Sequence, residues 1–204
     1  MKTRMFFPEY LEAGATDVRA VKLLQFWLLF AGCNDKIRIT GSFFLPTGIG
    51  VRKLQEDLEF SGEGVDAKFG PLTRNTVALM RKCYIDSIPV NFFERNKAAL
   101  GGELFFPQSV ELLSKDPAAL KLLQTALLFA GCNNEIVADG IDGTETANGL
   151  KVLQRDLGFP EKFWTGKLDD KTRVALFAQR GLDLSSIPAD IFEVKAPARV
   201  GMQA

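Results

Sequence analysis

The side chains best suited to binding a ligand are glutamines and arginines that occur in two similar sets. In each set a glutamine lies beside apolar residues and a Thr-Arg pair follows it: Gln55 with Thr73-Arg74, and Gln154 with Thr172-Arg173. A guanidinium group can bind a carboxylate through two parallel hydrogen bonds, and an amide can donate and accept at the same time. These residue types indicate a site that recognises a polar ligand.

Both residue types also have a structural interpretation, which the sequence leaves open. A glutamine amide can bond loop backbone that would otherwise be buried without a partner, and this applies to Gln25, Gln55, Gln124 and Gln154. A surface arginine can stay solvated and contribute little. We favour the bonds to loop backbone for the glutamines and the solvated state for the arginines.

The residues that most enzymes use for nucleophilic or zinc chemistry are missing. The chain contains no histidine, which removes Ser-His and Cys-His pairs and histidine-containing zinc sites. Two carboxylates could still serve a glycosidase, but both halves of the chain are taken up by small helical modules. We therefore expect a protein that is not an enzyme and that carries no cofactor.

One acidic loop and two tryptophans remain as further candidates. The loop Asp139–Glu145, which includes Asp142, lacks the alternating ligand spacing of a calcium loop, and its counterpart Thr40–Pro46 has no carboxylate. We expect no metal site there. Trp27 lies within an apolar helix and is predicted to be core, whereas Trp164 lies on a loop and could stack on a sugar ring.

The two sets of candidate residues belong to a duplicated sequence. Phe6–Glu94 aligns without a gap with Phe105–Glu193, and well over a third of the positions are identical. Unrelated segments would match at about one position in fifteen, given ordinary residue frequencies. The chain is therefore one module used twice.

Composition excludes several classes of partner. Lys plus Arg number 25 and Asp plus Glu number 25, so the basic surplus of a nucleic-acid-binding protein is absent. The longest apolar stretch, Phe26–Cys33, is far shorter than the roughly 18 residues of a membrane span. Pro8 and the glutamates that follow it interrupt any export signal, so we leave the localisation open.

Three cysteines, Cys33, Cys83 and Cys132, form no duplicated pattern that would suggest a disulfide. We expect three reduced thiols packed as small apolar groups.

Each module is predicted to hold three helices. The first runs from about Asp17 to Ala31 and from Asp116 to Ala130, with the aspartates as N-caps and with Gly32 and Gly131 as terminators. The second is expected to begin at N-caps Thr47 and Thr146, and the third near Pro71 or Asp170. The predicted buried stripes contain Val21, Leu24, Leu28, Val51, Leu54 and Leu58, with their counterparts Leu120, Leu123, Leu127, Leu150, Leu153 and Leu157.

Segments that contain proline flank each helical unit. Phe6–Pro8 and Phe105–Pro107 lead in, and Ser87–Pro89 and Ser186–Pro188 lead out. Proline disfavours helix in its neighbour, so we expect extended arms on the module surface. The predicted domains are 1–94 (core 18–80) and 105–194 (core 117–178), with a linker at 95–104 and a flexible tail at 195–204.

The order of these motifs resembles a known family. A Leu-Gln pair, a turn containing glycine, a second Leu-Gln pair and a threonine entry to the third helix occur in both halves, over Val18–Met80 and Pro117–Ala178. This order resembles the three-helix peptidoglycan-binding module of cell-wall hydrolases. The resemblance implies a mainly α fold of two tandem three-helix bundles joined by extended arms. The turns depart from the family pattern, for example with Thr40-Gly41 in place of Asp-Gly.

The resemblance implies a ligand site made of polar turn residues and their neighbours. The candidate ligand-binding residues are Thr40, Gln55, Asp66, Thr73, Arg74, Asp139, Asp142, Gln154, Trp164, Thr172 and Arg173. The function expected from this is non-catalytic binding to peptidoglycan, with two weak sites acting together. Without an export signal, delivery in a phage particle or by lysis would bring the protein to the wall.

A second hypothesis keeps the fold and changes the partner. A structural or adaptor protein would use the modules for protein contacts, and the phenylalanines and prolines of the arms could then dock on a neighbouring module in the same chain or form a homo-oligomer. Fold alone does not decide between a wall and a protein as the partner.

Overall fold

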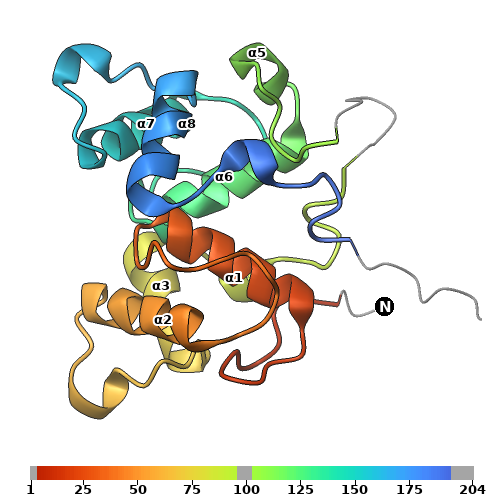
Figure 1. Ribbon diagram of the computed structural model, residues 1–204, viewed down its shortest axis with the longest axis vertical. Helices are drawn as coiled ribbons and strands as arrows, with labels where there is room; N and C mark the ends of the chain where they lie inside the picture. The colour runs from red at the N-terminus through yellow and green to blue at the C-terminus, as the bar shows by residue number, and fades with distance from the viewer. Residues whose placement is uncertain (1–3, 96–102, 194–204) are drawn as a thin grey trace, which may run out of the picture.

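The computed structural model describes residues 4–95 and 103–193, and within these ranges the protein is mainly α (Figure 1). Those residues form no strand, only isolated β-bridges. The helices are α1 (Val18–Phe30), α2 (Leu45–Asp57), α3 (Pro71–Arg81), α5 (Val110–Leu113), α6 (Pro117–Phe129), α7 (Thr144–Asp156) and α8 (Asp170–Arg180). Short 3-10 turns are η1 (Gly62–Gly64), η2 (Ile85–Ser87), η3 (Glu161–Phe163) and η4 (Leu184–Ser186).

Helices α1, α2 and α3 occupy equivalent positions in the alignment to α6, α7 and α8. The short helix α5 has no helical counterpart in the first half and was not predicted. Most of the predicted linker, at 96–102, and the whole predicted tail at 195–204 lie outside the described residues.

The first helix of each half begins and ends where the sequence predicts. The Asp17 carboxylate accepts a hydrogen bond from the Ala20 N–H at 3.0 Å, and the Asp116 carboxylate accepts one from the Ala119 N–H at 3.1 Å. After each helix a glycine takes a left-handed conformation, which residues with a side chain adopt only under strain.

The second helix of each half begins two residues earlier than predicted. Helix α2 starts at Leu45 and α7 at Thr144, so the assignment of Thr47 and Thr146 as N-caps was wrong. Both threonines lie inside the first turn and are buried. The Thr47 hydroxyl accepts a hydrogen bond from the Gln25 amide at 3.0 Å and is therefore used for tertiary contact instead of capping.

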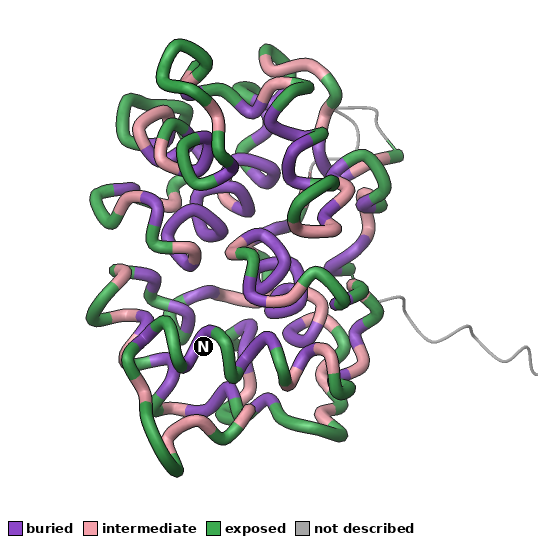
Figure 2. Tube along the Cα trace, turned by 60° about the vertical axis from the view of Figure 1, so that its left-hand side comes forward, coloured by how far each residue is buried: buried purple, intermediate pink, exposed green. Residues whose placement is uncertain are grey.

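Helices α1 and α6 pack against each other in the centre of the molecule (Figure 1). Almost every residue of both helices is buried, around their whole circumference rather than along one stripe. A helix that is apolar all round needs neighbours on every side. Helix α1 finds them in α2 of its own half and in α6 and α8 of the other half, and α6 finds them in α7, α1 and α3. The buried apolar residues therefore form one continuous cluster that includes both halves, instead of a separate core in each half. Figure 2 shows buried positions in the interior of both halves.

Stacked rings and hydrogen bonds connect the two halves across this junction. The Trp27 ring stacks on Phe129 with centroids 5.1 Å apart, and its Nε1 donates to the Thr125 hydroxyl at 3.2 Å. Arg81 donates to the Phe129 carbonyl, and Arg180 donates to the Phe30 carbonyl in return. Each arginine thus satisfies a carbonyl at the end of the other half's first helix, where the helix dipole also favours a cation.

The proline-containing arms pair with each other within each half. The Phe6 N–H donates to the Ile88 carbonyl at 2.7 Å, and the Phe105 N–H donates to the Ile187 carbonyl at 2.8 Å. Their phenylalanines are buried in the core, so the prediction that the arms lie on the surface was wrong for these side chains.

Phe6 of the leading arm also joins the two halves, because its ring meets the ring of Phe192, shortly after the trailing arm of the second half, edge to face at 5.9 Å. The docking surface that the arms were expected to offer is used within the chain.

The three cysteines are buried free thiols, as predicted. Burial raises the pKa of Cys33, Cys83 and Cys132 to about 12. Since only the thiolate reacts, about one thiol in ten thousand is reactive at pH 8. We expect a colorimetric thiol reagent to label none of the three within minutes in the folded protein and all three in denaturant. Rapid labelling of a folded thiol would contradict this burial.

Candidate functional site

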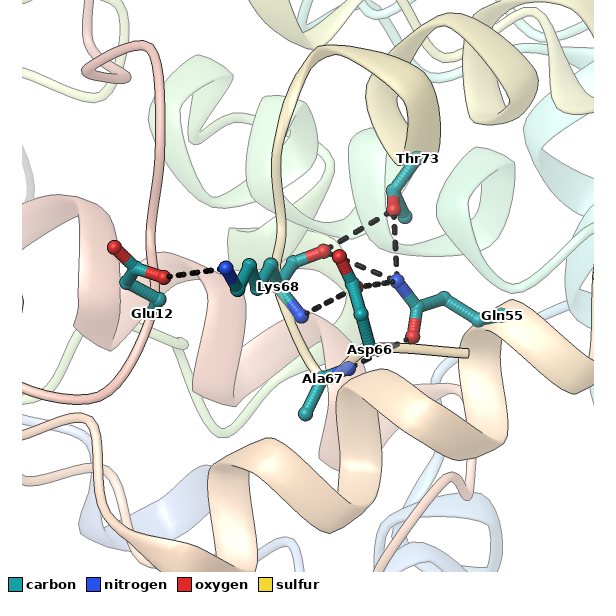
Figure 3. A network of polar contacts seen from close by, with 6 residues as sticks. All are labelled: Glu12, Gln55, Asp66, Ala67, Lys68 and Thr73. Carbon is teal, nitrogen blue, oxygen red and sulfur yellow. Dashed lines mark hydrogen bonds and ion pairs between the residues drawn. The ribbon is translucent and has the colours of Figure 1, made fainter. Parts of the chain in front are cut away.

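Gln55 lies at the centre of a polar network that holds the loop before α3 (Figure 3). Its Nε2 donates to the Asp66 carboxylate at 2.8 Å, the Lys68 carbonyl at 3.1 Å and the Thr73 hydroxyl at 3.1 Å. Its Oε1 accepts from the Ala67 N–H at 3.1 Å. A single amide therefore fixes the loop to the start of the third helix.

Gln154 makes the same contacts in the second half, although the loop sequence differs. Its Nε2 donates to the Thr165 hydroxyl at 2.9 Å, the Lys167 carbonyl at 3.1 Å and the Thr172 hydroxyl at 2.9 Å. Its Oε1 accepts from the Gly166 N–H at 3.1 Å. Thr165 replaces an aspartate as the acceptor, so the network survives the substitution.

Gln25 and Gln124 hold the earlier loop in each half. The Gln25 Oε1 accepts from the N–H groups of Thr40 and Gly41, both at 3.0 Å. The Gln124 Oε1 accepts from the Gly140 N–H at 2.8 Å. All four glutamines thus bond loop backbone, which is the interpretation that the sequence favours.

The central amides are enclosed and fully bonded. The exposed fraction is 1% for Gln55 and 0% for Gln154, and Thr73 and Thr172 are also buried. Buried polar groups of this kind are strongly bound to their protein partners. The structure places these four predicted site residues inside the module, where they shape the loops.

The two arginines are buried, so their assignment as solvated side chains was wrong. Arg74 donates to the Asp86 carboxylate at 2.8 Å and to the Pro8 carbonyl, and Arg173 donates to the Pro107 carbonyl at 2.6 Å. Burial lowers the pKa of Arg173, and nearby Asp170 partly opposes that shift. Each guanidinium group clamps the incoming arm against the third helix, a long-range contact that the sequence does not reveal.

The remaining predicted site residues lie at the surface, where they do not form one cluster. Thr40, Asp66 and Asp139 are exposed, and each side chain accepts a bond from the N–H two residues onward in its own turn. Asp142 is exposed and makes no hydrogen bond to any residue that the structure describes. Trp164 is half-buried, and its Nε1 donates to the Phe159 carbonyl at 2.7 Å.

An open groove on the second half was missed by the sequence reasoning. It lies between η3 and α8 and has a volume of about 440 Å³. Its lining residues are Phe159, Phe163, Asp170, Lys171, Val174 and Ala175. The groove is open to solvent, and the surface that lines it is apolar.

Phe163 is the exposed aromatic residue of this groove, with an exposed fraction of 41%. The Lys171 ammonium nitrogen lies 5.0 Å from its ring centroid and the Lys162 nitrogen 5.1 Å. An exposed aromatic ring with two cations close to it can hold an apolar group beside an anion. A comparison of the two halves could have pointed to Phe163, because the first half has Gly64 at the equivalent position.

The N-cap of α8 places a carboxylate next to Lys171. Burial raises the pKa of Asp169, but hydrogen bonds from the Thr172 N–H and hydroxyl and from the Thr165 hydroxyl lower it on balance, with help from Lys171. Asp169 therefore stays ionised over the physiological range and fixes the start of the helix that lines the groove.

The described residues contain no helix that is both long and apolar enough to span a bilayer. In the same ranges, no group of three or more cysteine or acidic side chains is placed to hold a metal ion.

Comparison with known proteins gives one match, which lies within the second half. Residues 116–176 match a family model, PG_binding_1, whose description is "Putative peptidoglycan binding domain". No curated protein and no solved structure matches the chain. The matched residues include α6, α7, η3, the first part of α8 and all six residues that line the groove. The resemblance to the peptidoglycan-binding family is therefore confirmed for residues 116–176.

Proposed function

We propose that this protein binds peptidoglycan through its second half and does so without catalysis. The observation that carries the proposal is the family match over residues 116–176, which falls on the half that has the open groove. The enclosed glutamines and threonines would support the site from below, and the exposed residues of the groove would contact the wall.

The proposal treats the first half as a second copy of the same module with a different task. Equivalent helices and the same glutamine networks support this division into repeats at 1–94 and 105–194. At the positions of Lys162, Phe163 and Lys171 the first half carries Glu63, Gly64 and Leu72, and these three residues supply neither an aromatic ring nor a cation. Its task would be to complete the shared core and keep the second half folded.

A non-catalytic role is supported by the chemistry available at the groove. The chain has no histidine, and Asp170 is the carboxylate residue in the groove lining. Glycoside hydrolysis ordinarily needs a pair of carboxyl groups that face the bond from both sides. The groove would therefore hold a ligand without cleaving it.

Sedimentation with purified, insoluble cell wall tests the proposal. We expect the full chain to pellet with the wall in a saturable way and to stay in the supernatant when the wall is omitted. A chain that stays in the supernatant at every wall concentration, under conditions where it is folded, would show that the proposal is wrong.

A second candidate function, a structural or adaptor role, is favoured by one feature of the first half. Phe44 and Leu45, at the start of α2, have exposed fractions of 70% and 76%, and Ile49 follows one turn later on the same helix. The second half has Gly143, Thr144 and Asn148 at these positions. Exposed apolar clusters of this kind often mark protein contacts.

Molar mass in solution separates the two functions. A stable oligomer that L45T and I49N convert to a monomer would favour the adaptor, whereas a monomer that pellets with the wall would favour peptidoglycan binding. The proposed phage or lysis association is tested separately by the neighbouring genes, since lysis genes and virion genes point to different roles.

A further inference from the structure

We propose that the groove between η3 and α8 binds the peptide stems of peptidoglycan, not its glycan strands. A stem carboxylate would lie at Lys162 and Lys171, and an apolar side chain of the stem would pack on Phe163. This inference rests on the proposed wall-binding function and names the part of the wall that the site takes.

The groove offers an apolar floor that is already formed. Val174 is exposed on the second turn of α8, next to Ala175, and Phe159 and Phe163 close the opposite side. Two hydrogen bonds fix the backbone of Phe159. Its N–H donates to the Gln154 carbonyl at 3.0 Å, and its carbonyl accepts from the Trp164 Nε1. The floor is therefore held in position before a ligand binds, which reduces the entropy lost on binding.

Charge complementarity identifies the peptide stem as the occupant. Within residues 4–95 and 103–193, Lys162 and Lys171 contact the Phe163 ring and form no ion pair with a carboxylate. An ammonium group above a ring keeps hydrogen-bond donors for another partner. Stem peptides carry free carboxylates next to small apolar side chains, whereas the sugar rings of the glycan present mainly hydroxyl and amide groups.

Asp170, the first residue of α8, borders the groove with its carboxylate outside the apolar lining. Its carboxylate would repel an isolated anion, but it can accept a hydrogen bond from an ammonium group. Stems carry amino groups on some side chains as well as carboxylates. Two lysines with one aspartate therefore fit a zwitterionic peptide better than a simple anion or a neutral sugar.

The first half provides an internal comparison for this site. The three residues that would contact the ligand, Lys162, Phe163 and Lys171, correspond to Glu63, Gly64 and Leu72. The backbone positions are equivalent, since η1 and η3 both have three residues and precede helices of equal length. The first half therefore has the same backbone arrangement but lacks the two lysines and the phenylalanine.

The experiment gives the second half the residues of the first. The full chain carries K162E, F163G and K171L, singly and together, and L72K in the first half is the matched control. Calorimetry measures binding to a soluble N-acetylmuramoyl pentapeptide and to a chitin oligosaccharide, which represents the glycan. Thermal unfolding of each variant checks that the fold is intact.

We expect the triple variant to bind the pentapeptide at least about tenfold more weakly than the unmodified chain, which corresponds to about 1.4 kcal/mol. L72K should bind as the unmodified chain does, and the oligosaccharide should bind weakly or not at all. A folded triple variant with unchanged affinity, or tighter binding of the oligosaccharide than of the pentapeptide, would overturn the inference. If either of these two outcomes is found but the unmodified chain still pellets with the wall, the inference is wrong and the proposed function stands. If it does not pellet, both are wrong.

Discussion

Replacing Gln154 by alanine is expected to lower the free energy of unfolding by about 3 kcal/mol. The amide donates to the Thr165 and Thr172 hydroxyls and to the Lys167 carbonyl, and it accepts from the Gly166 N–H. Its loss leaves several buried polar groups unpaired, and each unpaired group costs about 1–3 kcal/mol unless water reaches it. Urea denaturation with a fixed m value measures the change.

Gln179→Ala is the matched control for this substitution. Gln179 lies on the exposed side of α8 and donates to the Leu157 carbonyl at 2.8 Å. Removing a partly solvated bond of this kind should cost under about 1 kcal/mol. A loss of similar size in both variants would mean that the enclosed network around Gln154 adds no special stability.

The second large effect is expected at the junction between the halves, where Trp27→Ala should lower the free energy of unfolding by about 4 kcal/mol. The ring is fully buried, stacks on Phe7 at 5.5 Å and on Phe129 at 5.1 Å, and donates to Thr125. Alanine suits the helix itself, because the second half has Ala126 at the equivalent position. The cost would therefore come from the cavity at the junction.

Phe44→Ala serves as the control, since that ring is largely exposed and should change stability by less than about 0.5 kcal/mol. Both variants and the unmodified chain should unfold in one cooperative transition, because the core is continuous across the halves. Two separate transitions in the unmodified chain, with Trp27→Ala affecting neither, would contradict the shared core.

The helices could be predicted from the sequence because their signals are local. The Asp17 and Asp116 caps, the glycine terminators and the entry to α3 and α8 depend on residues within a few positions of one another. The prediction of Thr47 as an N-cap was wrong because it also used only local residues. Thr47 looks like a cap from its neighbours, but its hydroxyl bonds Gln25, which is distant in the sequence.

The site was harder to predict, because the same residue types serve structure and recognition. Arg74 and Arg173 bind carbonyls of the Phe-Phe-Pro arms, and nothing in the sequence around each arginine reveals that contact. The groove depends on the folding of η3 against α8, which brings Lys162, Phe163 and Lys171 together. The burial of nearly every residue of α1 and α6 likewise depends on the packing of the two halves on each other, which the local sequence does not reveal.

The most direct test of the account is a map of amide chemical shifts in the isotope-labelled full chain during titration with soluble peptidoglycan fragments. We predict saturable shifts centred on residues 159–175, at the groove, and much smaller shifts at the equivalent residues 60–76 of the first half. Shifts centred on the first half, or none anywhere at saturating fragment, would contradict peptidoglycan binding by the second half.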